Sequence, residues 1–355
     1  MVIPSLHSGG MERVMSELAG YFCKQLNTEI HLVMYGINPE VFYPLPQDLI
    51  IHQPDWVFDN KKRKWNTVKR MIYLRQTIKK MNPVSVLSFG EYWNNFVLLA
   101  TWGLRKRVFV SDRCRPDKSL GKMHDYLRAR LYPHASGVIV QTETAKSIYK
   151  KYFNHPNIQV IGNPIRIIGI PPGNEKENLI LSVGRLIKTK HHDELIRIFA
   201  KINPPDWKLV IVGDDAVKQQ NRVLLESLIA DLGMADKIIL AGNCSDVDSF
   251  YLKSKIFAFA SSSEGFPNVI GEAQSAGLPV IAFDCIAGPS DLVQDGVNGF
   301  LVPLFDYQIF ELRLKQLIDS EDLRASLGSN ARLSIKEFAS EKICFNYYKF
   351  ILGDV

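Results

Sequence analysis

Short apolar runs alternate with amphipathic segments along the whole chain. In the first half the runs cover residues 1–6, 29–35, 84–89, 107–111, 137–141 and 158–161. In the second half they cover residues 179–183, 208–212, 237–240, 256–260 and 278–283. Between many of these runs, apolar residues recur at helical spacing, as in 11–26, 120–131 and 143–152. Buried strands that alternate with helices predict an α/β fold with doubly wound parallel sheets.

The alternation is interrupted once, at a Pro-Pro-Gly stretch near residues 171–173. A chain of 355 residues exceeds the usual size of one hydrophobic core, so two domains are expected. We predict a first domain over 1–163, a linker over 164–177, and a second domain over 178–339. The remaining residues, 340–355, form an amphipathic helix.

Charge divides unevenly between the two halves. The net charge is +6, yet Met1–Asn163 holds 23 Lys and Arg against 12 Asp and Glu. A basic first half suggests an anionic partner, with nucleic acid, a membrane surface and a lipid phosphate all open at this point. No apolar run reaches the roughly 18–20 residues of a membrane span, and no signal peptide is evident. The five scattered cysteines indicate reduced thiols in a cytosolic protein.

Residues 61–80 form a basic segment with nine Lys and Arg, no acid, and Trp65 and Tyr73 among its apolar positions. One interpretation is a helix that lies on an anionic membrane surface. The other is a helix that buries its apolar side on the sheet and leaves its charges in water. Both can hold together, because a docked helix can still present a basic outer face.

Two carboxylates eight positions apart dominate the segment 261–283. The pattern predicts a strand, a loop with Glu264, a helix from Asn268 to Ala276 that carries Glu272, and another strand. Glu264 then lies at the carboxyl edge of the sheet, where open α/β sheets bind ligands. The first N–H groups of the helix, at Asn268 and Val269, favour an anion there. A diphosphate flanked by a sugar and a ribose matches this arrangement.

This segment resembles the Glu-x7-Glu signature of retaining GT-B glycosyltransferases of family 4, which often reads EGFPNVLxEA. The match includes Gly265, Phe266 and Pro267. The resemblance implies two Rossmann-like domains that face a cleft, with the acceptor bound by the first and the nucleotide-sugar by the second. It also implies that Glu264 holds a hydroxyl of the donor sugar and that Glu272 holds the ribose. In such proteins the C-terminal helix crosses back to the first domain.

Other motifs extend the resemblance over almost the whole chain. In GRLIKTK, Arg185 and Lys190 match the family's Arg-x4-Lys spacing, which implies contact with the donor diphosphate; Lys188 is a rival to Lys190. Gly9 and Gly10 resemble the family's GGAERV loop across from the phosphates. Family members usually carry several residues before VIPSL, which indicates a truncated or misassigned start.

Four further positions are candidates for contacts with the acceptor or the donor. Glu91 and Asn94 follow the strand 84–89 and could line an acceptor pocket. Arg113 stands where relatives have a histidine or an arginine; it is either a phosphate contact or an arginine on a surface loop. Gly242 follows the strand 237–240, where the resemblance places the nucleotide base.

Two apparent metal motifs are better explained without a metal. The spacing of Asp246 and Asp248 imitates a DxD motif, but its position at a helix start predicts N-capping. His191 and His192 lack a third ligand at useful spacing, so we interpret them as surface residues. We therefore expect no metal and no cofactor other than the nucleotide-sugar substrate.

The resulting hypothesis is a transferase that moves a hexose or N-acetylhexosamine from a UDP-sugar to a glycan hydroxyl with retention. The acceptor would be a polyprenyl-diphosphate-linked glycan in bacterial capsule or O-antigen assembly, at the inner face of the cytoplasmic membrane. Partners would be the nucleotide-sugar, the acceptor and anionic lipid, without nucleic acid; the oligomeric state stays open. Two alternatives remain: a GT-B nucleotide-sugar epimerase, and a binding protein without catalysis.

Overall fold

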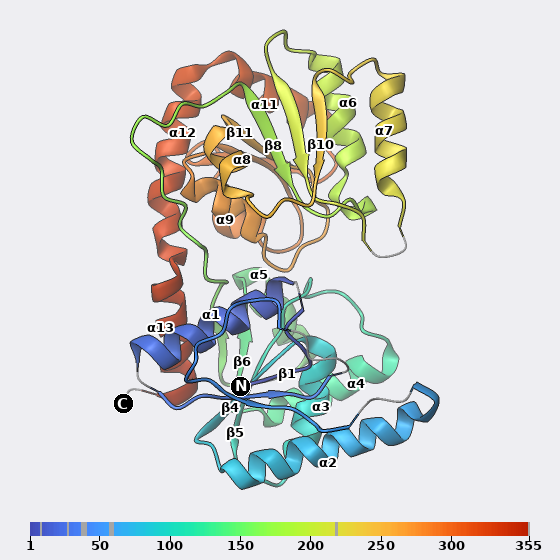
Figure 1. Ribbon diagram of the computed structural model, residues 1–355, viewed down its shortest axis with the longest axis vertical. Helices are drawn as coiled ribbons and strands as arrows, with labels where there is room; N and C mark the ends of the chain where they lie inside the picture. The colour runs from blue at the N-terminus through green and yellow to red at the C-terminus, as the bar shows by residue number, and fades with distance from the viewer. Residues whose placement is uncertain (8, 27, 37–40, 57–59, 217–218, 354–355) are drawn as a thin grey trace. The chain divides into compact units, whose positions relative to one another are not determined.

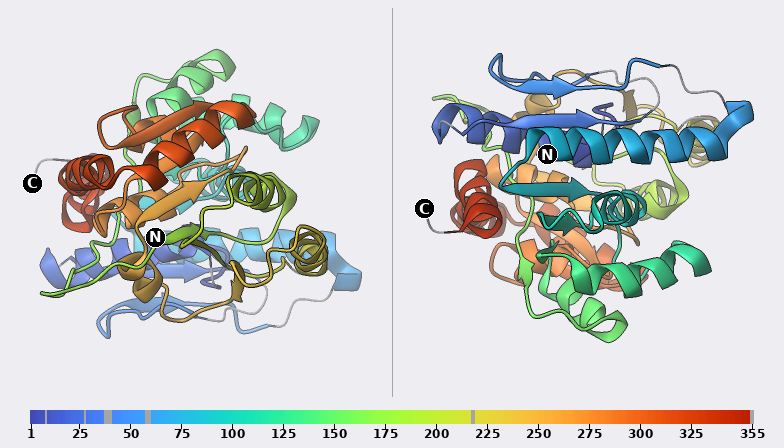
Figure 2. Two further views of the ribbon diagram at one scale, coloured as in Figure 1. Left: turned by 90° about the horizontal axis from the view of Figure 1, so that it is seen from above. Right: turned by 90° about the horizontal axis from the view of Figure 1, so that it is seen from below.

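The computed structural model describes residues 1–7, 9–26, 28–36, 41–56, 60–216 and 219–353. It divides into two compact units. Unit 1 comprises Met1–Pro164 together with the C-terminal segment from Ser340, and unit 2 comprises Ile165–Ala339. Each unit contains one parallel sheet with helices on both faces (Figures 1 and 2).

The sheet of unit 1 has the strand order β3-β2-β1-β4-β5-β6-β7, and every pairing is parallel. Its strands are β1 Val2–Ile3, β2 His31–Met34, β3 Ile50–His52, β4 Ser85–Phe89, β5 Arg107–Ser111, β6 Gly137–Val140 and β7 Ile158–Val160. Its helices are α1 Gly10–Gln25, α2 Arg63–Met81, α3 Glu91–Thr101, α4 Lys122–Leu131, α5 Glu143–Tyr152 and α13 Ser340–Leu352.

Alternate residues along these strands pack against different helices, because successive side chains point to opposite faces of a sheet. Val108 and Val110 of β5 share a core with residues of α2, α3 and α5. Phe109, between them, stacks edge-on against Phe350 of α13, with ring centroids 5.3 Å apart. The C-terminal helix is therefore part of the core of unit 1.

The sheet of unit 2 has the strand order β10-β9-β8-β11-β12-β13, again fully parallel. Its strands are β8 Leu179–Val183, β9 Lys208–Val212, β10 Ile238–Gly242, β11 Ile256–Phe259, β12 Val280–Asp284 and β13 Gly299–Pro303. Its helices are α6 His192–Ile202, α7 Asn221–Asp231, α8 Asp248–Lys253, α9 Asn268–Ser275, α10 Pro289–Leu292, α11 Tyr307–Asp319 and α12 Glu321–Ser334.

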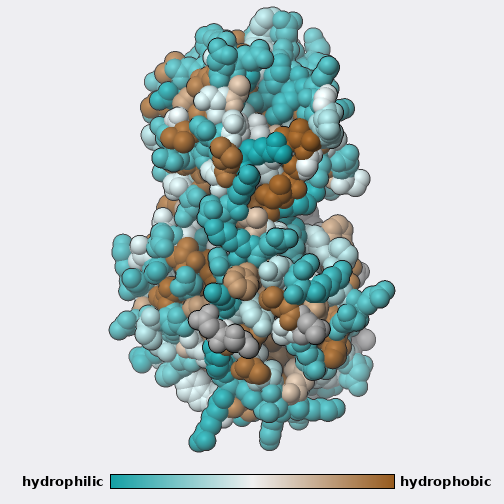
Figure 3. Space-filling model, turned by 90° about the vertical axis from the view of Figure 1, so that its left-hand side faces the viewer, coloured by the Kyte–Doolittle hydropathy of each residue, from teal (hydrophilic) through white to brown (hydrophobic). Residues whose placement is uncertain are grey.

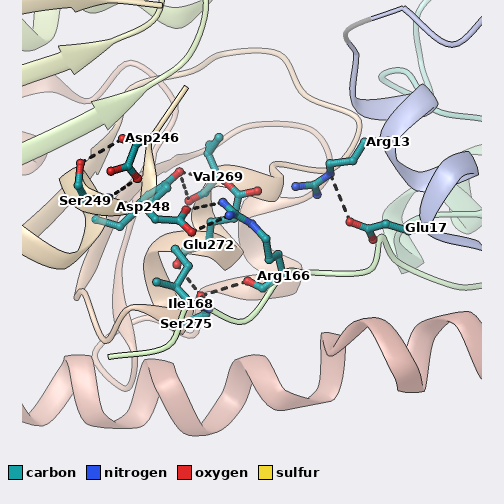
Figure 4. Close-up of polar contacts among 11 residues, drawn as sticks. Arg13, Glu17, Arg166, Ile168, Asp246, Asp248, Ser249, Val269, Glu272 and Ser275 are labelled. Carbon is teal, nitrogen blue, oxygen red and sulfur yellow. Dashed lines mark hydrogen bonds and ion pairs between the residues drawn. The ribbon is translucent and has the colours of Figure 1, made fainter. Parts of the chain in front are cut away.

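The segment 164–177, which was expected to be a linker, packs onto unit 2 from Ile165 onward. Ile165 and Ile168 are buried in the core beside β11 and α9. The N–H of Ile168 donates to the Ser275 hydroxyl at 3.1 Å, as Figure 4 shows. Two apolar side chains in this Pro- and Gly-bearing stretch explain the difference, because burying them stabilises the segment against the sheet.

The basic segment 61–80 is mostly helical, as α2. This helix buries a narrow stripe that includes Leu74 and Ile78 and leaves Trp65, Val68 and Ile72 exposed. It thus buries its apolar side on the sheet and presents basic side chains to solvent.

The face of the molecule seen in Figure 3 is mostly hydrophilic, with hydrophobic groups in small separate patches.

Candidate functional site

The strand order of unit 2 reverses direction between β8 and β11. These two strands are neighbours in the sheet, but the chain leaves β8 toward β9 on one side and β11 toward β12 on the other. Ligands of open α/β sheets bind at the carboxyl ends of the strands at such a switch point. The loops that leave β8 and β11 carry Arg185, Lys190 and Glu264. The fold therefore brings together Lys190 and Glu264, which come from two separate motifs, whereas Arg185 lines a cavity that neither of them lines.

An ion pair connects the two loops. Lys190 Nζ lies 2.6 Å from Glu264 Oε1, and the two side chains are only 15% and 14% exposed. The same ammonium lies 4.8 Å from the centre of the Phe259 ring. Lys188 is exposed, whereas Lys190 is the lysine of this turn that pairs with Glu264. The geometry thus favours Lys190 over its rival as the group that shares a ligand with Glu264.

Arg185 is exposed near the start of the loop that follows β8. It lines a cavity of about 670 Å³ together with Lys188, Gln219 and Asn221, among others. Among the described residues, its guanidinium has no hydrogen-bond acceptor or ion-pair partner. A cation in this state can turn toward an incoming phosphate without first breaking an internal bond.

The start of α9 differs in detail from the expectation. The N–H of Asn268 donates to the carbonyl of Phe266 at 3.1 Å, so this donor is already used. Phe266 and Pro267 are buried, whereas Gly265 and Val269 are partly exposed. A side chain at Gly288 would lie 2.2 Å from Pro267 Cδ, so the loop after β12 packs tightly here. The prediction that the Asn268 N–H is unpaired and open to an anion is therefore wrong, because this N–H closes the tight turn at Phe266–Pro267.

Glu272 is buried on the inner side of α9, with 8% of its surface exposed. The Tyr251 hydroxyl of α8 donates to Glu272 Oε2 at 3.1 Å. Figure 4 shows Glu272 on α9 beside Val269. A hydroxyl that holds one carboxylate oxygen fixes the orientation of the other, which suits a carboxylate that accepts from a ligand hydroxyl.

The loop after β10 also lies at the carboxyl edge of the sheet. Gly242 has φ +72°, a conformation that favours glycine, and its carbonyl accepts from the N–H of Gly213. Asp246 caps α8 by accepting from the Ser249 N–H at 3.2 Å. Asp248 pairs with Arg166 through two bonds of 2.5 and 2.6 Å (Figure 4). Asp246 thus accepts from the first turn of α8, as N-capping requires, whereas Asp248 does not cap the helix but forms an ion pair.

The surface assignment of the histidine pair is wrong for His192. Its side chain is 4% exposed beneath the turn that carries Arg185 and Lys190. Burial, with Lys190 nearby as a smaller cause, lowers the pKa of His192 to about 4. The imidazole is therefore neutral at neutral pH. His191 is half-buried and contacts Ser262.

In unit 1, the backbone of Gly9 is bonded on both sides by one tyrosine. The Gly9 N–H donates to the Tyr43 hydroxyl at 3.1 Å, and that hydroxyl donates to the Gly9 carbonyl at 3.0 Å. Helix α1 begins at Gly10. Tyr43 would have to release the Gly9 N–H before a ligand could bind it.

Glu91 and Asn94, predicted to line an acceptor pocket, are buried. Asn94 is fully buried and its amide donates to Asp112 and to the Ser111 carbonyl, at 2.8 and 3.1 Å. Glu91 accepts from the backbone N–H groups of Arg113 and Cys114. Their polar atoms are used to shape the loop after β5, so we correct the prediction that they contact an acceptor directly.

The buried acid in this loop, Asp112, was not singled out from the sequence. It accepts from the hydroxyls of Tyr132 and Tyr149, which come from different elements. Burial, and then the charge of Glu91, raises the pKa of Asp112 to about 6. No local spacing marks such a cluster, because its members are brought together only by the sheet.

Arg113 is neither a free surface arginine nor an open phosphate contact. Its guanidinium donates to Asn163 and, at 2.8 Å, to the Tyr347 hydroxyl of α13. It also lies 3.7 Å from the centre of the Phe89 ring. Within unit 1 this side chain therefore ties the C-terminal helix to the sheet.

Two statements apply to the described part of the chain as a whole. No three His, Cys, Asp or Glu side chains gather there as ligands for a metal ion. None of its helices combines the length and the apolar character that crossing a bilayer requires.

Two Rossmann-like parallel-sheet units, with the acid–cation pair at the switch point of the second, agree with the GT-B architecture that the sequence resemblance implied. The sequence matches two family models that together span most of the chain. Residues 8–167 match the model described as Glycosyltransferase Family 4, and residues 166–334 match Glycosyl transferases group 1. The chain therefore belongs to the GT-B glycosyltransferases of the family-4 type.

Curated relatives align over nearly the full length. The chain is 27% identical to the amylovoran biosynthesis glycosyltransferase AmsD of Erwinia amylovora, over 95% of this chain and 94% of that protein. It is 26% identical, over 99% and 97%, to a Campylobacter jejuni α-1,4-N-acetyl-D-galactosaminyltransferase. The full name of that enzyme describes an acceptor linked to undecaprenol through a diphosphate.

Solved structures share the fold at lower identity. Anabaena HepE, solved in complex with UDP, aligns with a TM-score of 0.81 at 18% identity, over 98% of this chain and 97% of HepE. S. aureus TarM, solved with UDP, aligns with a TM-score of 0.67 at 22% identity over 79% of this chain. The chain spans 58% of the length of TarM.

Proposed function

We propose that this glycosyltransferase moves a hexose or N-acetylhexosamine from a UDP-sugar to a hydroxyl of a glycan, with retention at the anomeric carbon. The observation that carries the proposal is the ion pair between Lys190 and Glu264 at the switch point of unit 2. A cation for a phosphate and a carboxylate for a sugar hydroxyl are thereby placed side by side. The UDP bound in HepE and TarM is consistent with a uridine nucleotide as donor.

In this mechanism Lys190 and Arg185 stabilise the negative charge that develops on the departing diphosphate. Charge-assisted bonds of this kind contribute about 1.5–3 kcal/mol each. Glu264 would hold the donor sugar through a hydroxyl, and Glu272 would hold the ribose. No carboxylate acts as a covalent nucleophile, and a phosphate oxygen takes the proton of the acceptor hydroxyl. We propose no metal, because these cations neutralise the diphosphate themselves.

For the acceptor we propose a polyprenyl-diphosphate-linked glycan of a bacterial surface polysaccharide. The name of the Campylobacter relative describes such an acceptor, and AmsD acts in amylovoran biosynthesis. Helix α2 supports a position at the inner face of the cytoplasmic membrane. Its first turn exposes Lys64 and Trp65, the latter to 65%, and Lys62 is exposed at the N-cap position just before it. Basic residues near anionic lipid each contribute about 1 kcal/mol to binding.

The donor and acceptor are tested by a screen of UDP-sugars that measures UDP release with and without lipid-linked oligosaccharides. We expect release that depends on the acceptor and a product with the same anomeric configuration as the donor. Isomerised sugar without an acceptor would indicate an epimerase. Binding of a UDP-sugar with no formation of free UDP under any condition would indicate a binding protein without catalysis.

The membrane assignment has a separate test with a matched control. Replacing Lys62 and Lys64 by Gln should weaken binding to vesicles that contain phosphatidylglycerol by about 30-fold, from about 1 kcal/mol per charge. Replacing Lys150 and Lys151, exposed on α5 of the same unit, should have little effect. Equal loss in both pairs would point to net charge alone rather than to α2 as the contact.

A further inference from the structure

His191 adopts a left-handed backbone conformation between the turn that carries Lys190 and helix α6. Its φ and ψ are 48° and 41°. Its N–H donates to the Lys188 carbonyl, and its own carbonyl accepts from Leu195 in the first turn of α6. Glycine adopts this conformation without strain, whereas other residues rarely do. An imidazole at such a position raises the question of what the side chain contributes.

The imidazole of His191 contacts two other loops at the carboxyl edge of the sheet. Nε2 lies 2.9 Å from the Ser262 hydroxyl, in the loop between β11 and α9. The ring stacks edge-on against Phe305, with centroids 5.4 Å apart. Phe305 follows β13 and is itself left-handed, with φ +67°. The side chain thus contacts the loops that follow β11 and β13 in addition to its own.

Ser262 in turn holds the turn from which His191 projects. The Ser262 N–H donates to the Thr189 carbonyl at 2.8 Å. The Ser262 hydroxyl donates to the same carbonyl at 3.3 Å, and the Ser261 hydroxyl donates to it at 3.2 Å. Hydrogen bonds therefore connect His191 through Ser262 to the Thr189 carbonyl.

Lys190 stands in sequence between Thr189 and His191, the two residues that Ser262 contacts. Glu264 follows Ser262 by two positions. The same contacts therefore fix the backbone on both sides of the ion pair between Lys190 and Glu264. We propose that His191 is a positioning residue that holds Lys190 and Glu264 at the spacing which a donor diphosphate and its sugar require. This inference rests on the proposed function, since it deepens the role of that site.

Replacement by glycine separates positioning from folding. His191→Gly removes the imidazole and also removes the backbone strain, so the folded protein should be as stable as the wild type or more stable. We expect UDP to bind about tenfold more weakly and kcat/KM for the donor to fall at least tenfold. Asn203→Gly is the matched control, because Asn203 is left-handed at the other end of α6 and lies outside the site. It should leave both values unchanged.

Ser262 provides the conservative pair. Ser262→Thr keeps the hydroxyl and should retain wild-type UDP affinity, whereas Ser262→Ala should resemble His191→Gly. Because the two residues act through one hydrogen bond, the double variant should lose no more than the worse single variant. Additive losses would contradict a shared role.

Hydrogen exchange tests the contact without any donor sugar. In His191→Gly, the amide of Ser262 should exchange at least tenfold faster than in the wild type, because its bond to Thr189 is no longer held in place. Unchanged exchange together with wild-type UDP affinity would overturn the proposal. A melting temperature lowered by several degrees would also overturn it, since the residue would then be needed for folding. Failure of the wild type to bind UDP would instead refute the proposed function, and the exchange result would still stand.

Discussion

Lys190 Nζ lies 2.6 Å from Glu264 Oε1, although the two residues come from loops on either side of the strand reversal in unit 2. In the absence of a ligand the two charges neutralise each other. A nucleotide-sugar whose diphosphate binds Lys190 and whose sugar hydroxyl binds Glu264 must compete with this ion pair for both side chains. The pair is therefore a sensitive place to test the proposed chemistry.

Replacing Glu264 by Gln should uncouple binding from transfer. The ammonium of Lys190 loses its internal partner, so UDP should bind as tightly as in the wild type or a few-fold tighter. Transfer should fall by about 100-fold, the scale of losing one preorganised polar group in an active site. Calorimetric titration with UDP and a UDP-release assay measure the two effects. A parallel loss of both would contradict the assignment of Glu264 to the sugar.

Replacing Lys190 by Ala should weaken UDP binding by roughly 10- to 150-fold, because one charge-assisted bond of about 1.5–3 kcal/mol is lost. Lys188→Ala is the matched control on the same turn, since Lys188 is exposed and does not pair with Glu264. It should change the affinity by less than about threefold. If the two variants behaved alike, the contact would depend on the charge of the turn and not on Lys190.

Replacing Tyr251 by Phe should affect the donor through Glu272. The variant removes the hydroxyl that donates to Glu272 Oε2 at 3.1 Å and keeps the ring in its buried place. A loosened carboxylate should raise KM for the donor about five-fold, the scale of one net hydrogen bond of about 1 kcal/mol, with little change in kcat. Steady-state kinetics decide between this result and a fall in kcat alone, which would place Glu272 in the chemical step.

His192 should make the protein sensitive to acid. The unfolded chain takes up a proton near pH 6.5, whereas the buried imidazole takes it up only near pH 4. Its stabilising contribution is therefore complete above pH 6.5 and is lost as the pH falls from 6.5 to 4. The total loss is about 3 kcal/mol, at about 1.4 kcal/mol for each unit of pKa difference.

Urea unfolding at pH 7.5 and pH 5 measures this loss. The midpoint of His192→Gln should change less between the two pH values than that of the wild type. His134→Gln, at an exposed position, should keep the wild-type dependence. If His192→Gln kept it as well, the acid sensitivity would belong to other groups.

Replacing Tyr347 by Phe should weaken the attachment of α13 to unit 1. The bond from the Arg113 guanidinium to the Tyr347 hydroxyl is lost, at about 1.5–3 kcal/mol for a bond to a charged group. Tyr348→Phe on the same helix is the control, because Tyr348 contacts Phe22 through its ring alone among the described residues. Thermal unfolding should show a lower midpoint for the first variant only.

The sequence predicted the sheets and the position of the donor motifs well, because both are local patterns. A buried strand is marked by its apolar run, and Arg185 and Glu264 lie shortly after such runs, with Lys190 on the turn that follows Arg185. The position of the histidines was missed for the opposite reason. His192 is buried by the loop folded above it, and His191 is engaged by Ser262, which lies 71 positions away in the chain. Neither relationship leaves a periodic signal.

The polar residues after β4 and β5 show a second limit. Asn94 and Glu91 follow a strand, as ligand-binding residues often do, and this placement favoured a pocket. Their actual partners come from two other parts of the chain: Asp112 and Arg113 in the loop after β5, and Tyr132 just after α4. Whether a polar side chain at the edge of a sheet faces a ligand or another buried polar group depends on those elements, which sequence spacing does not describe.

The return of α13 to unit 1 sets the order in which the chain can fold during synthesis. Tyr347 and Ile351 belong to the core of unit 1, but they leave the ribosome only after all of Ile165–Ala339 has been made. At 5–20 residues per second, that interval is roughly 10–35 s. Unit 2 is complete in sequence before unit 1, so the nascent chain must carry an unfinished amino-terminal unit while its later half folds. Helix α13, the last element to be translated, therefore completes unit 1, whose translation began first.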